Sequence, residues 1–434
     1  MKEVYITGHR NPDLDSVCSA IAYADLKNRQ NDDGETVYIP IRCGHLSSSA
    51  QNILNSLNIE SPEYVPDIFP KVGDVILSAT DKIDIDAPLT EAAKSYKENN
   101  PSAIPVFSGD EFAGLLSVDD IASWFMNKLS GEQNIDRIPT VRELMRGQTI
   151  TVLANDLFEE AKSVLTNSKK RGLAVYDDGK FAGFVTRRCF LKPPKYNVIL
   201  VDHNEPKQSI KGIESANIIE IIDHHRLDAI KTNLPIFIDS EPLGSTCTIV
   251  YELFIRNGLV PSKETAKILL TGMLADTLVL KSPTTTPIDE RSAKALANIV
   301  GVDVTKFGLE MFSHMESLSK MDAQTAILSD FKRYSEQGTN IGIGQCEVTT
   351  LNDLNEYKDE FLKALNIICT QNALDWAVCM VTDVLKENSI LFTTDYRAVR
   401  YLPYSQIEPL LLDMPGVMSR KKQLLPEMIY SLGM

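Results

Sequence analysis

The sequence has no long hydrophobic run. Nowhere in its 434 residues do about 18 apolar residues follow one another, so the pattern predicts no membrane span. The first residues lead straight into a strand-like pattern, without the apolar segment of a signal peptide. We therefore expect a cytoplasmic protein that binds no membrane. At this length two to four domains are expected.

Cysteine pairs and positive charge are also scarce. The seven cysteines are scattered along the chain, and no two of them form a C-x-x-C pair. This distribution excludes a disulfide framework and a zinc knuckle and fits a reduced compartment. The formal net charge of −15 disfavours nonspecific binding to nucleic acid, which needs a basic face. An acidic protein can still act on an anion if metal ions supply the positive charge.

Histidine is rare as well, which makes its placement informative. Of the six histidines, two do not lie beside an aspartate, and we interpret His45 and His314 as ordinary packing or surface residues. The other four all have aspartate neighbours and are His9, His203, His224 and His225.

Three short apolar runs end at these histidines. They are VYIT (residues 4–7), NVILV (residues 197–201) and NIIEII (residues 217–222). Short β-branched runs are typical of buried parallel strands, and helical patterns at residues 16–28 and 246–258 lie between and after them. Strands that alternate with helices predict an α/β fold, in which ligands bind at the carboxyl edge of the sheet. We therefore expect the polar residues after the three runs to meet at one edge.

Several of the polar residues have a second interpretation. Asp13 and Asp15 precede a helical stretch, where the helix dipole favours acids whether or not they bind a metal. Asp276 follows the apolar run 266–275, which reads as either a helix or a strand. Ser245 and Thr246 in PLGSTC could place a phosphate at a helix N-terminus, but they are more simply explained as helix caps.

Together the clusters supply the donors of a two-metal site. Two divalent cations about 3.5–4 Å apart can activate one water against a phosphoric anhydride, and carboxylates and imidazoles suit such cations. Val17 breaks the pattern of an EF-hand, no cysteines cluster for zinc, and the G-x-S-x-G of a serine hydrolase is absent. His203 could be a ligand, a core histidine or, as we favour, a residue that supports a ligand. The candidate ligands are His9, Asp13, Asp15, Asp202, His224 and Asp276.

An internal repeat separates the first two strand runs. Residues 71–125 and 140–191 match each other, for example in the Phe-Ala-Gly triplets at 112–114 and 181–183. Prolines at 66, 70, 193 and 194 flank the pair, so it is inserted into the α/β domain. The remaining C-terminal part reads as a further α/β unit, with strands at 340–348, 376–385 and 388–394 and a helix within 351–372.

Five motifs occur in an order that resembles a known family. GHRNPDLDS, VDHNE, DHH, LADT and SRKKQ are similar to the motifs of the DHH phosphoesterase superfamily, and more closely to those of the family II, manganese-type inorganic pyrophosphatases. DHH alone is shared with exopolyphosphatases and oligonucleotide phosphodiesterases, whereas SRKKQ and VDHNE are more specific. The inserted repeats resemble a pair of CBS domains. The implied domains are 1–66 and 195–305 (DHH), 67–125 and 140–194 (CBS repeats, with linker 126–139), and 306–434 (substrate-clamping domain).

The resemblance implies a function and roles for single residues. The function is hydrolysis of pyrophosphate by a hydroxide between two Mn²⁺ or Co²⁺ ions, with Mg²⁺ arriving with the substrate. The alternatives are a phosphodiesterase for short oligonucleotides or cyclic dinucleotides, and a nucleotide sensor whose catalytic site has decayed. One metal is assigned to His9, Asp13 and Asp202, and the other to Asp15, Asp202, His224 and Asp276. The residues assigned to substrate phosphate are His225, Lys332, Arg420 and Lys421.

The CBS resemblance implies regulation by AMP, ADP or ATP. In the first repeat, GLLSVDD supplies Ser117 and Asp120 for a nucleotide ribose. In the second repeat, GFVTRRC keeps Thr186 and places Arg187 or Arg188 near phosphate, but Cys189 replaces the acid, so we expect one nucleotide per chain. The alternative is that the repeats serve only for dimerisation. A homodimer is implied in either case.

Overall fold

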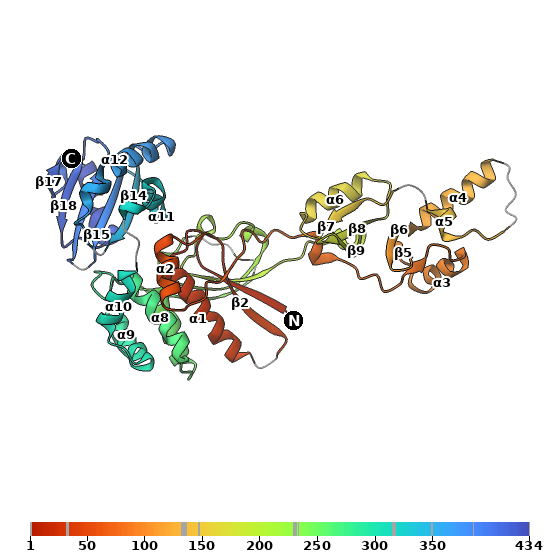
Figure 1. The fold of residues 1–434 in the computed structure, drawn as a ribbon, viewed down its shortest axis with the longest axis horizontal. Coiled ribbons are helices and arrows are strands. Elements are labelled where there is room, and N and C mark those ends of the chain that lie inside the picture. The colour runs from red at the N-terminus through yellow and green to blue at the C-terminus, as the bar shows by residue number, and fades with distance from the viewer. Residues whose placement is uncertain are drawn as a thin grey trace. The chain divides into compact units, whose positions relative to one another are not determined.

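The computed structural model describes residues 2–31, 34–131, 137–145, 148–228, 232, 234–314, 318–348, 350–384 and 386–433 (Figure 1). The chain divides into two compact units, Met1–Ile68 with Asn197–Met434, and Phe69–Tyr196. The first unit has two lobes, which we call the first lobe (residues 1–68 and 197–314) and the second lobe (residues 318–433). Within the described stretches, no helix is long and apolar enough to cross a membrane.

The first lobe is built on a six-stranded parallel sheet of order β12-β11-β10-β1-β2-β3. The three apolar runs read from the sequence form its neighbouring strands β1, β10 and β11, so the predicted parallel α/β sheet is confirmed. The strands are β1 (Lys2–Thr7), β2 (Thr36–Arg42), β3 (Glu63–Tyr64), β10 (Asn197–Val201), β11 (Asn217–Asp223) and β12 (Phe237–Ser240).

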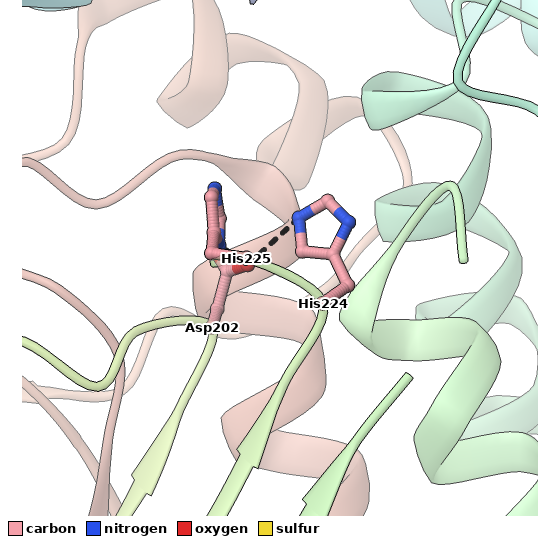
Figure 2. A group of neighbouring side chains, drawn as sticks. All are labelled: Asp202, His224 and His225. Carbon is pink, nitrogen blue, oxygen red and sulfur yellow. Dashed lines mark ion pairs between the residues drawn. The ribbon is translucent and has the colours of Figure 1, made fainter. Parts of the chain in front are cut away.

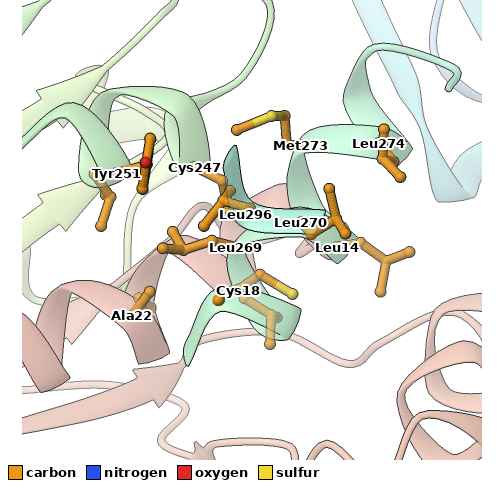
Figure 3. Close-up of a cluster of buried hydrophobic side chains, with 14 of the residues drawn as sticks. Leu14, Cys18, Ala22, Cys247, Tyr251, Leu269, Leu270, Met273, Leu274 and Leu296 are labelled. Atoms are coloured by element: carbon orange, nitrogen blue, oxygen red, sulfur yellow. The ribbon is translucent and has the colours of Figure 1, made fainter. Parts of the chain in front are cut away.

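A layer of helices packs on this sheet and forms the main core (Figure 3). Cys18 of α1, Cys247 of α7 and Leu270 of α8 are fully buried in it. Gly272 lets α8 approach the other two helices, because a Cβ there would lie 2.5 Å from the Cys247 Sγ. The helices are α1 (Leu14–Gln30), α2 (Ser48–Ser56), α7 (Thr246–Arg256), α8 (Lys263–Asp276), α9 (Pro287–Val300) and α10 (Val304–Ser313), with the short turns η3 (Pro206–Gln208) and η4 (Ile213–Ser215).

The second lobe has a mixed six-stranded sheet of order β13-β14-β15-β16-β18-β17, in which only β14 and β15 run parallel. The strands and the helix read from the sequence correspond to β14, β15, β16 and α12, whereas β13, β17 and β18 were not anticipated. Its elements are η5 (Leu318–Lys320), α11 (Ala323–Ser329), β13 (Phe331–Glu336), β14 (Thr339–Val348), α12 (Leu354–Gln371), β15 (Trp376–Asp383), β16 (Asn388–Thr393), η6 (Val399–Tyr401), β17 (Ser405–Glu408), β18 (Leu411–Pro415), η7 (Arg420–Leu424) and α13 (Leu425–Leu432).

The second unit consists of two similar copies, as the repeat and its CBS resemblance predict. In each copy a short strand runs parallel to a second strand, which pairs with a third in antiparallel fashion. The first copy contains η1 (Val72–Val75), β4 (Ile83–Asp84), α3 (Leu89–Asn99), β5 (Ala103–Ser108), β6 (Glu111–Ser117) and α4 (Val118–Ser130). The second contains α5 (Val141–Leu144), β7 (Thr151–Leu153), α6 (Phe158–Asn167), β8 (Gly172–Asp177), β9 (Lys180–Thr186) and η2 (Arg187–Phe190).

The two copies are joined by matched contacts. The rings of Phe112 and Phe181, from the two Phe-Ala-Gly triplets, stack with centroids 3.9 Å apart. Each copy also exchanges its leading segment, because Gly73 bonds to the backbone of Ala154 and Val141 bonds to that of Ala87. Neither copy is therefore complete without the other.

Candidate metal centre

Six candidate ligands meet at the carboxyl edge of the parallel sheet. Two of the ligands stand directly after the ends of strands: Asp202 follows β10 and His224 follows β11 (Figure 2). His9 follows β1 after one intervening glycine. Asp13 caps the start of α1 and Asp276 is the last residue of α8, so the run left open by the sequence is a helix. The sheet edge therefore gathers residues that lie as far apart in the chain as His9 and Asp276.

Their donor atoms form groups of the size of a metal site. One group is His9, Asp13 and Asp202, and a second is Asp15, His224 and Asp276, with the donor atoms of each group within 4.8 Å of one another. The His9 Nε2 lies 3.3 Å from Asp13 Oδ2 and 3.4 Å from Asp202 Oδ2. A further group joins Asp202 with the two consecutive histidines His224 and His225.

Asp202 lies between the two groups. The His224 Nε2 lies 3.5 Å from Asp202 Oδ1 and 3.4 Å from Asp276 Oδ2. One carboxylate thus faces His9 with one oxygen and His224 with the other. The backbone of Asp202 adopts a φ of +61°, in the left-handed region that non-glycine residues rarely occupy and that often marks functional positions.

The hydrogen bonds of His224 leave its inner nitrogen available. Its Nδ1 lies 3.0 Å from the Leu243 carbonyl oxygen, so in the neutral ring Nδ1 carries the proton and donates it. The Nε2 then carries a lone pair, and this lone pair faces carboxylates. Both the His224 Nε2 and the Asp202 Oδ2 are buried without a hydrogen bond. A lone pair and carboxylate oxygens that face one another need a cation between them, so the donor set fits divalent metals.

Electrostatics show the same crowding of negative charge. Burial and the neighbouring carboxylates of Asp15 and Asp13 raise the pKa of Asp202, and the same causes raise the pKa of Asp276. Burial disfavours the charged form of His9, but Asp13 and Asp202 outweigh it and raise the His9 pKa well above its usual value. The cluster therefore attracts positive charge, as protons or as metal ions.

Asp15 is held by the N-terminus of a different helix. Its carboxylate accepts hydrogen bonds from Ser245 Oγ at 2.6 Å, from the Thr246 N–H at 2.7 Å and from the Cys247 N–H at 3.0 Å. Ser245 is also the N-cap of α7. The cap interpretation of PLGSTC is confirmed for Ser245, whereas the N–H groups that could have held a phosphate are bonded to the Asp15 carboxylate.

Asp13 likewise combines two roles. Its Oδ1 accepts the N–H of Ser16 at 2.8 Å and so caps α1, while its Oδ2 faces His9. The helix-start interpretation of this acid is therefore compatible with a place in the metal cluster.

Asp223 and Asn204 also belong to the site, although the sequence assigns no role to either. Asp223 Oδ1 lies 2.9 Å from His225 Nδ1, and Asn204 donates to the other Asp223 oxygen, so Asp223 sets the orientation of the His225 ring. Burial lowers the pKa of His225 to about 3 despite this carboxylate, so the ring is neutral near pH 7. The position of Asp223, first in DHH, was the available signal for it.

His203 lies beside the cluster and outside each of the ligand groups found among the described residues. Its Nδ1 bonds to the Val201 carbonyl at 2.9 Å, and its ring stands edge-on to that of His9 with centroids 6.4 Å apart. Burial lowers the His203 pKa to about 4, so the ring is neutral.

A cavity of about 560 Å³ opens beside the cluster, between the two lobes of the first unit. Asp13, Asp15 and Asp276 line it from the first lobe, and Asp330 and Glu347 line it from the second. This cavity leaves room for a small substrate next to the candidate ligands.

The cationic candidates come from the second lobe. Burial raises the pKa of Asp13, but His9 and the hydrogen bond from Ser16 outweigh it and lower this pKa. The charge of Lys332 on β13 also lowers the pKa of Asp13, although less strongly, so Lys332 lies within electrostatic reach of the cluster. Loss of hydration and the charge of Lys332 lower the pKa of Lys421. Arg420 is 6 % exposed and donates to the Asp330 carboxylate at 2.9 Å and to its carbonyl at 2.8 Å. Arg420 is therefore fixed in place by its own lobe.

The nucleotide candidates lie in the second unit at matching positions. Ser117 caps α4, and Asp120 accepts a hydrogen bond from the Ser117 N–H at 3.0 Å. Thr186 takes the matching cap position before η2, with Cys189 in the place of the acid. Arg187 lies near enough to the first copy for its charge to contribute to a lowered pKa of Asp119, after the hydrogen bond from Arg171.

Comparisons with known proteins agree with this geometry. The DHH family N-terminal domain matches residues 3–273, and the DHHA2 domain matches residues 309–429. The cobalt-dependent inorganic pyrophosphatase of Clostridium perfringens is 29 % identical, with 98 % of each chain covered. The manganese-dependent inorganic pyrophosphatase of Methanothrix thermoacetophila is 38 % identical over 53 % of this chain and 75 % of its own.

A solved structure gives the same class of fold. The Methanococcus jannaschii protein assigned to the family II inorganic pyrophosphatases superposes with a TM-score of 0.60 at 22 % identity, covering 99 % of this chain and 100 % of its own. Parallel sheet, carboxylate cluster and second lobe thus define a DHH-type protein. The chain belongs to the DHH family and, within it, to the family II inorganic pyrophosphatases.

Proposed function

We propose that the chain hydrolyses inorganic pyrophosphate to two phosphates with the help of two divalent metal ions. The observation that carries the proposal is the pair of ligand groups on either side of Asp202, since this is the donor arrangement that holds two cations around one shared carboxylate. The names of the relatives, one cobalt-dependent and one manganese-dependent, favour Co²⁺ or Mn²⁺.

We assign His9, Asp13 and Asp202 to one ion, and Asp15, His224 and Asp276, again with Asp202, to the other. When bound, such ions make a water acidic enough to act as a nucleophile near neutral pH and offset the charge of phosphate oxygens. The task of the protein is to hold these ligands in place and to admit the substrate through the cavity between the lobes.

On the substrate side, we assign His225, Lys332, Arg420 and Lys421 to phosphate oxygens. Pyrophosphate carries several negative charges, and the charge of Lys332 acts on Asp13 of the first lobe and on Asp330 of the second, which line the cavity from either side. Asp330 fixes Arg420 so that little side-chain freedom is lost when substrate binds. A magnesium ion that arrives with the substrate would offset the remaining charge.

The two-lobe arrangement supports a clamp. Lys281 of the first lobe pairs with Glu387 of the second at 3.0 Å, and Lys422 donates to the Pro283 carbonyl at 2.9 Å. These contacts tie the segment after Asp276 to the lobe that carries the cationic residues. Opening and closing of the lobes around the cavity would admit pyrophosphate and release phosphate.

We further propose that the second unit binds an adenine nucleotide such as AMP, ADP or ATP and regulates the hydrolysis. The support is the matched pair of helix starts, with Ser117 and Asp120 in one copy and Thr186 with Arg187 in the other. We also propose that the domains have the boundaries that the family resemblance implies, and that the protein is a homodimer.

A comparison of two substrates tests the proposed function. Metal-stripped protein, reloaded with Mn²⁺ or Co²⁺, is assayed for phosphate release from pyrophosphate and for cleavage of a linear dinucleotide under the same conditions. We expect rapid turnover of pyrophosphate and little or none of the dinucleotide. Faster cleavage of the dinucleotide would instead identify a phosphodiesterase, and the absence of both activities would overturn the proposed catalysis.

A further inference from the structure

A short loop contacts three of the proposed metal ligands. This loop, which we define as Leu243–Cys247, consists of the end of the connection from β12 and the first two residues of α7. Its Leu243 carbonyl accepts a hydrogen bond from His224 Nδ1, its backbone N–H groups donate to Asp15, and the Thr246 Oγ1 donates to Asp202 at 3.0 Å. The position of this one loop therefore affects ligands of both metal groups.

Next to the loop lies a buried carboxylate, Asp289, that is neither a proposed metal ligand nor a proposed contact of the substrate. Asp289 is 0 % exposed and accepts four hydrogen bonds. Its Oδ1 accepts a hydrogen bond from the Thr248 hydroxyl at 2.6 Å, and its Oδ2 accepts one from the Gly244 N–H at 2.9 Å. The Oδ2 also accepts hydrogen bonds from the N–H and the hydroxyl of Thr286, both at 2.7 Å. Both oxygens are engaged by the protein, so Asp289 is itself no metal ligand in this arrangement.

The bonds of Asp289 join two helix starts. Thr286 caps α9, Thr248 lies in the first turn of α7, and Gly244 lies in the loop just before α7. A capping box for α9 requires only Thr286 and Asp289. The bonds to Gly244 and Thr248 go beyond that requirement and fix the loop and α7 against α9. Burying a carboxylate is costly unless it is fully hydrogen-bonded, which this one is.

The contact between the loop and Asp289 leaves no spare room. A Cβ on Gly244 would lie 2.9 Å from Asp289 Oδ2 and 2.7 Å from the Thr277 Cγ2. Real Cβ atoms essentially never approach other atoms this closely, so any larger residue at 244 would push the loop away from Asp289.

We propose that Asp289 is a positioning residue for the metal centre. It anchors the loop Leu243–Cys247, and through this loop it sets the ring orientation of His224 and the places of Asp15 and Asp202. The proposal rests on the proposed two-metal function. It differs from a merely structural role, in which the loss of Asp289 would lower the thermal stability but leave the affinity for metal unchanged.

The test measures metal affinity directly. Full-length, metal-stripped Asp289→Asn is titrated with Mn²⁺ by calorimetry, well below its unfolding temperature. Asparagine keeps the size of the side chain but offers one acceptor oxygen in place of two. Residues that orient metal ligands typically change affinity by about ten- to a hundredfold, so we expect the dissociation constant for Mn²⁺ to rise by this amount.

Two further variants separate the explanations. Gly244→Ala, which keeps Asp289 but displaces the loop, is expected to weaken Mn²⁺ binding in the same direction, and it decides the question if Asp289→Asn does not fold. Asp303→Asn makes the same substitution at the N-cap of the neighbouring helix α10, and we expect it to bind Mn²⁺ like the wild type.

Three outcomes are distinguishable. Weaker binding in Asp289→Asn and Gly244→Ala, with Asp303→Asn unchanged, supports the positioning role. Mn²⁺ binding within twofold of the wild type in both loop variants overturns it, even if both melt at lower temperature. A wild-type protein that binds no Mn²⁺ and hydrolyses no pyrophosphate would instead overturn the proposed function on which the inference rests.

Discussion

The backbone N–H of Thr246 donates a hydrogen bond of 2.7 Å to the carboxylate of Asp15, 231 residues earlier in the chain. The N-terminus of α7 thereby places its positive dipole end against an acid that belongs to another helix. This contact offsets part of the repulsion among the clustered carboxylates and fixes the orientation of Asp15.

The shared carboxylate is expected to be indispensable. Asp202→Asn removes the charge that faces both His9 and His224, so we expect kcat/KM for pyrophosphate to fall by on the order of a thousandfold or more. The measurement is phosphate release at saturating Mn²⁺. Asp110→Asn, at an exposed turn of the second unit, serves as the control and should retain full activity. Full activity in Asp202→Asn would end the two-metal interpretation.

Neighbouring residues on one strand give a matched pair for substrate binding. Side chains alternate along β13, so Lys332 and Arg333 point to opposite faces of the sheet. Lys332 acts on the acidic cluster, whereas Arg333 contacts Asn372 away from it. We expect Lys332→Gln to lower kcat/KM by about ten- to a hundredfold or more and Arg333→Gln to change it by less than about twofold. Equal effects in steady-state assays would remove Lys332 from the substrate site.

The two repeats are expected to differ in nucleotide binding. Asp120 supplies a carboxylate at the start of α4, and Cys189 occupies the matching position of the second copy. We expect Asp120→Ala to weaken AMP binding by about tenfold, because a hydrogen bond to a charged group contributes roughly 1.5–3 kcal/mol. Cys189→Ala should change it little. Calorimetric titration of both variants checks this, and unaltered AMP affinity in Asp120→Ala would contradict the assigned role.

A carboxyl group in the cavity predicts a pH dependence of stability. Burial, and next the charge of Asp330, raise the pKa of Glu347 to about 7. The folded state thus holds this proton more tightly than the unfolded state. The stability that it contributes is present at low pH and is lost as the pH rises from the unfolded pKa, near 4.5, through about 7.

Glu347→Gln removes this dependence. In metal-stripped protein, we expect the free energy of unfolding of the variant to gain on that of the wild type by about 1–2 kcal/mol between pH 5.5 and pH 8, since one pKa unit corresponds to about 1.4 kcal/mol. Urea unfolding of the second lobe can be followed by Trp376 fluorescence in a Trp124→Phe background. A difference between the two proteins that stays constant with pH would show that Glu347 titrates normally.

Much of the fold was predictable because its signals are local. Short apolar runs that end in acids and histidines are sufficient to place β1, β10 and β11 side by side, and the Phe-Ala-Gly triplets disclose the repeat. The strands β13 and β17 were missed because they carry mixed, partly exposed residues whose pairing is decided by neighbours in the sheet. The strand β18 is mostly buried, but its five residues are too few to show a clear strand pattern.

The supporting contacts of the site were harder to predict. Asp223 and Asp289 act through hydrogen bonds to residues that the fold brings close, and no spacing in the sequence discloses such partners. For Asp289 the sequence does offer a Thr-x-x-Asp pattern, but that pattern predicts only the start of a helix. The left-handed backbone of Asp202 has no sequence signal either, since aspartate follows strands in many conformations.

The central claim is that two metal ions share Asp202, and a titration of metal against activity tests it most directly. Metal-stripped protein is mixed with increasing Mn²⁺ or Co²⁺ under conditions of tight binding, and bound metal and pyrophosphate hydrolysis are measured in the same samples. The account predicts that activity rises until two ions are bound per chain and then stays level, and that Asp202→Asn fails to reach this stoichiometry. Full activity with a single bound ion, or with none, would contradict it.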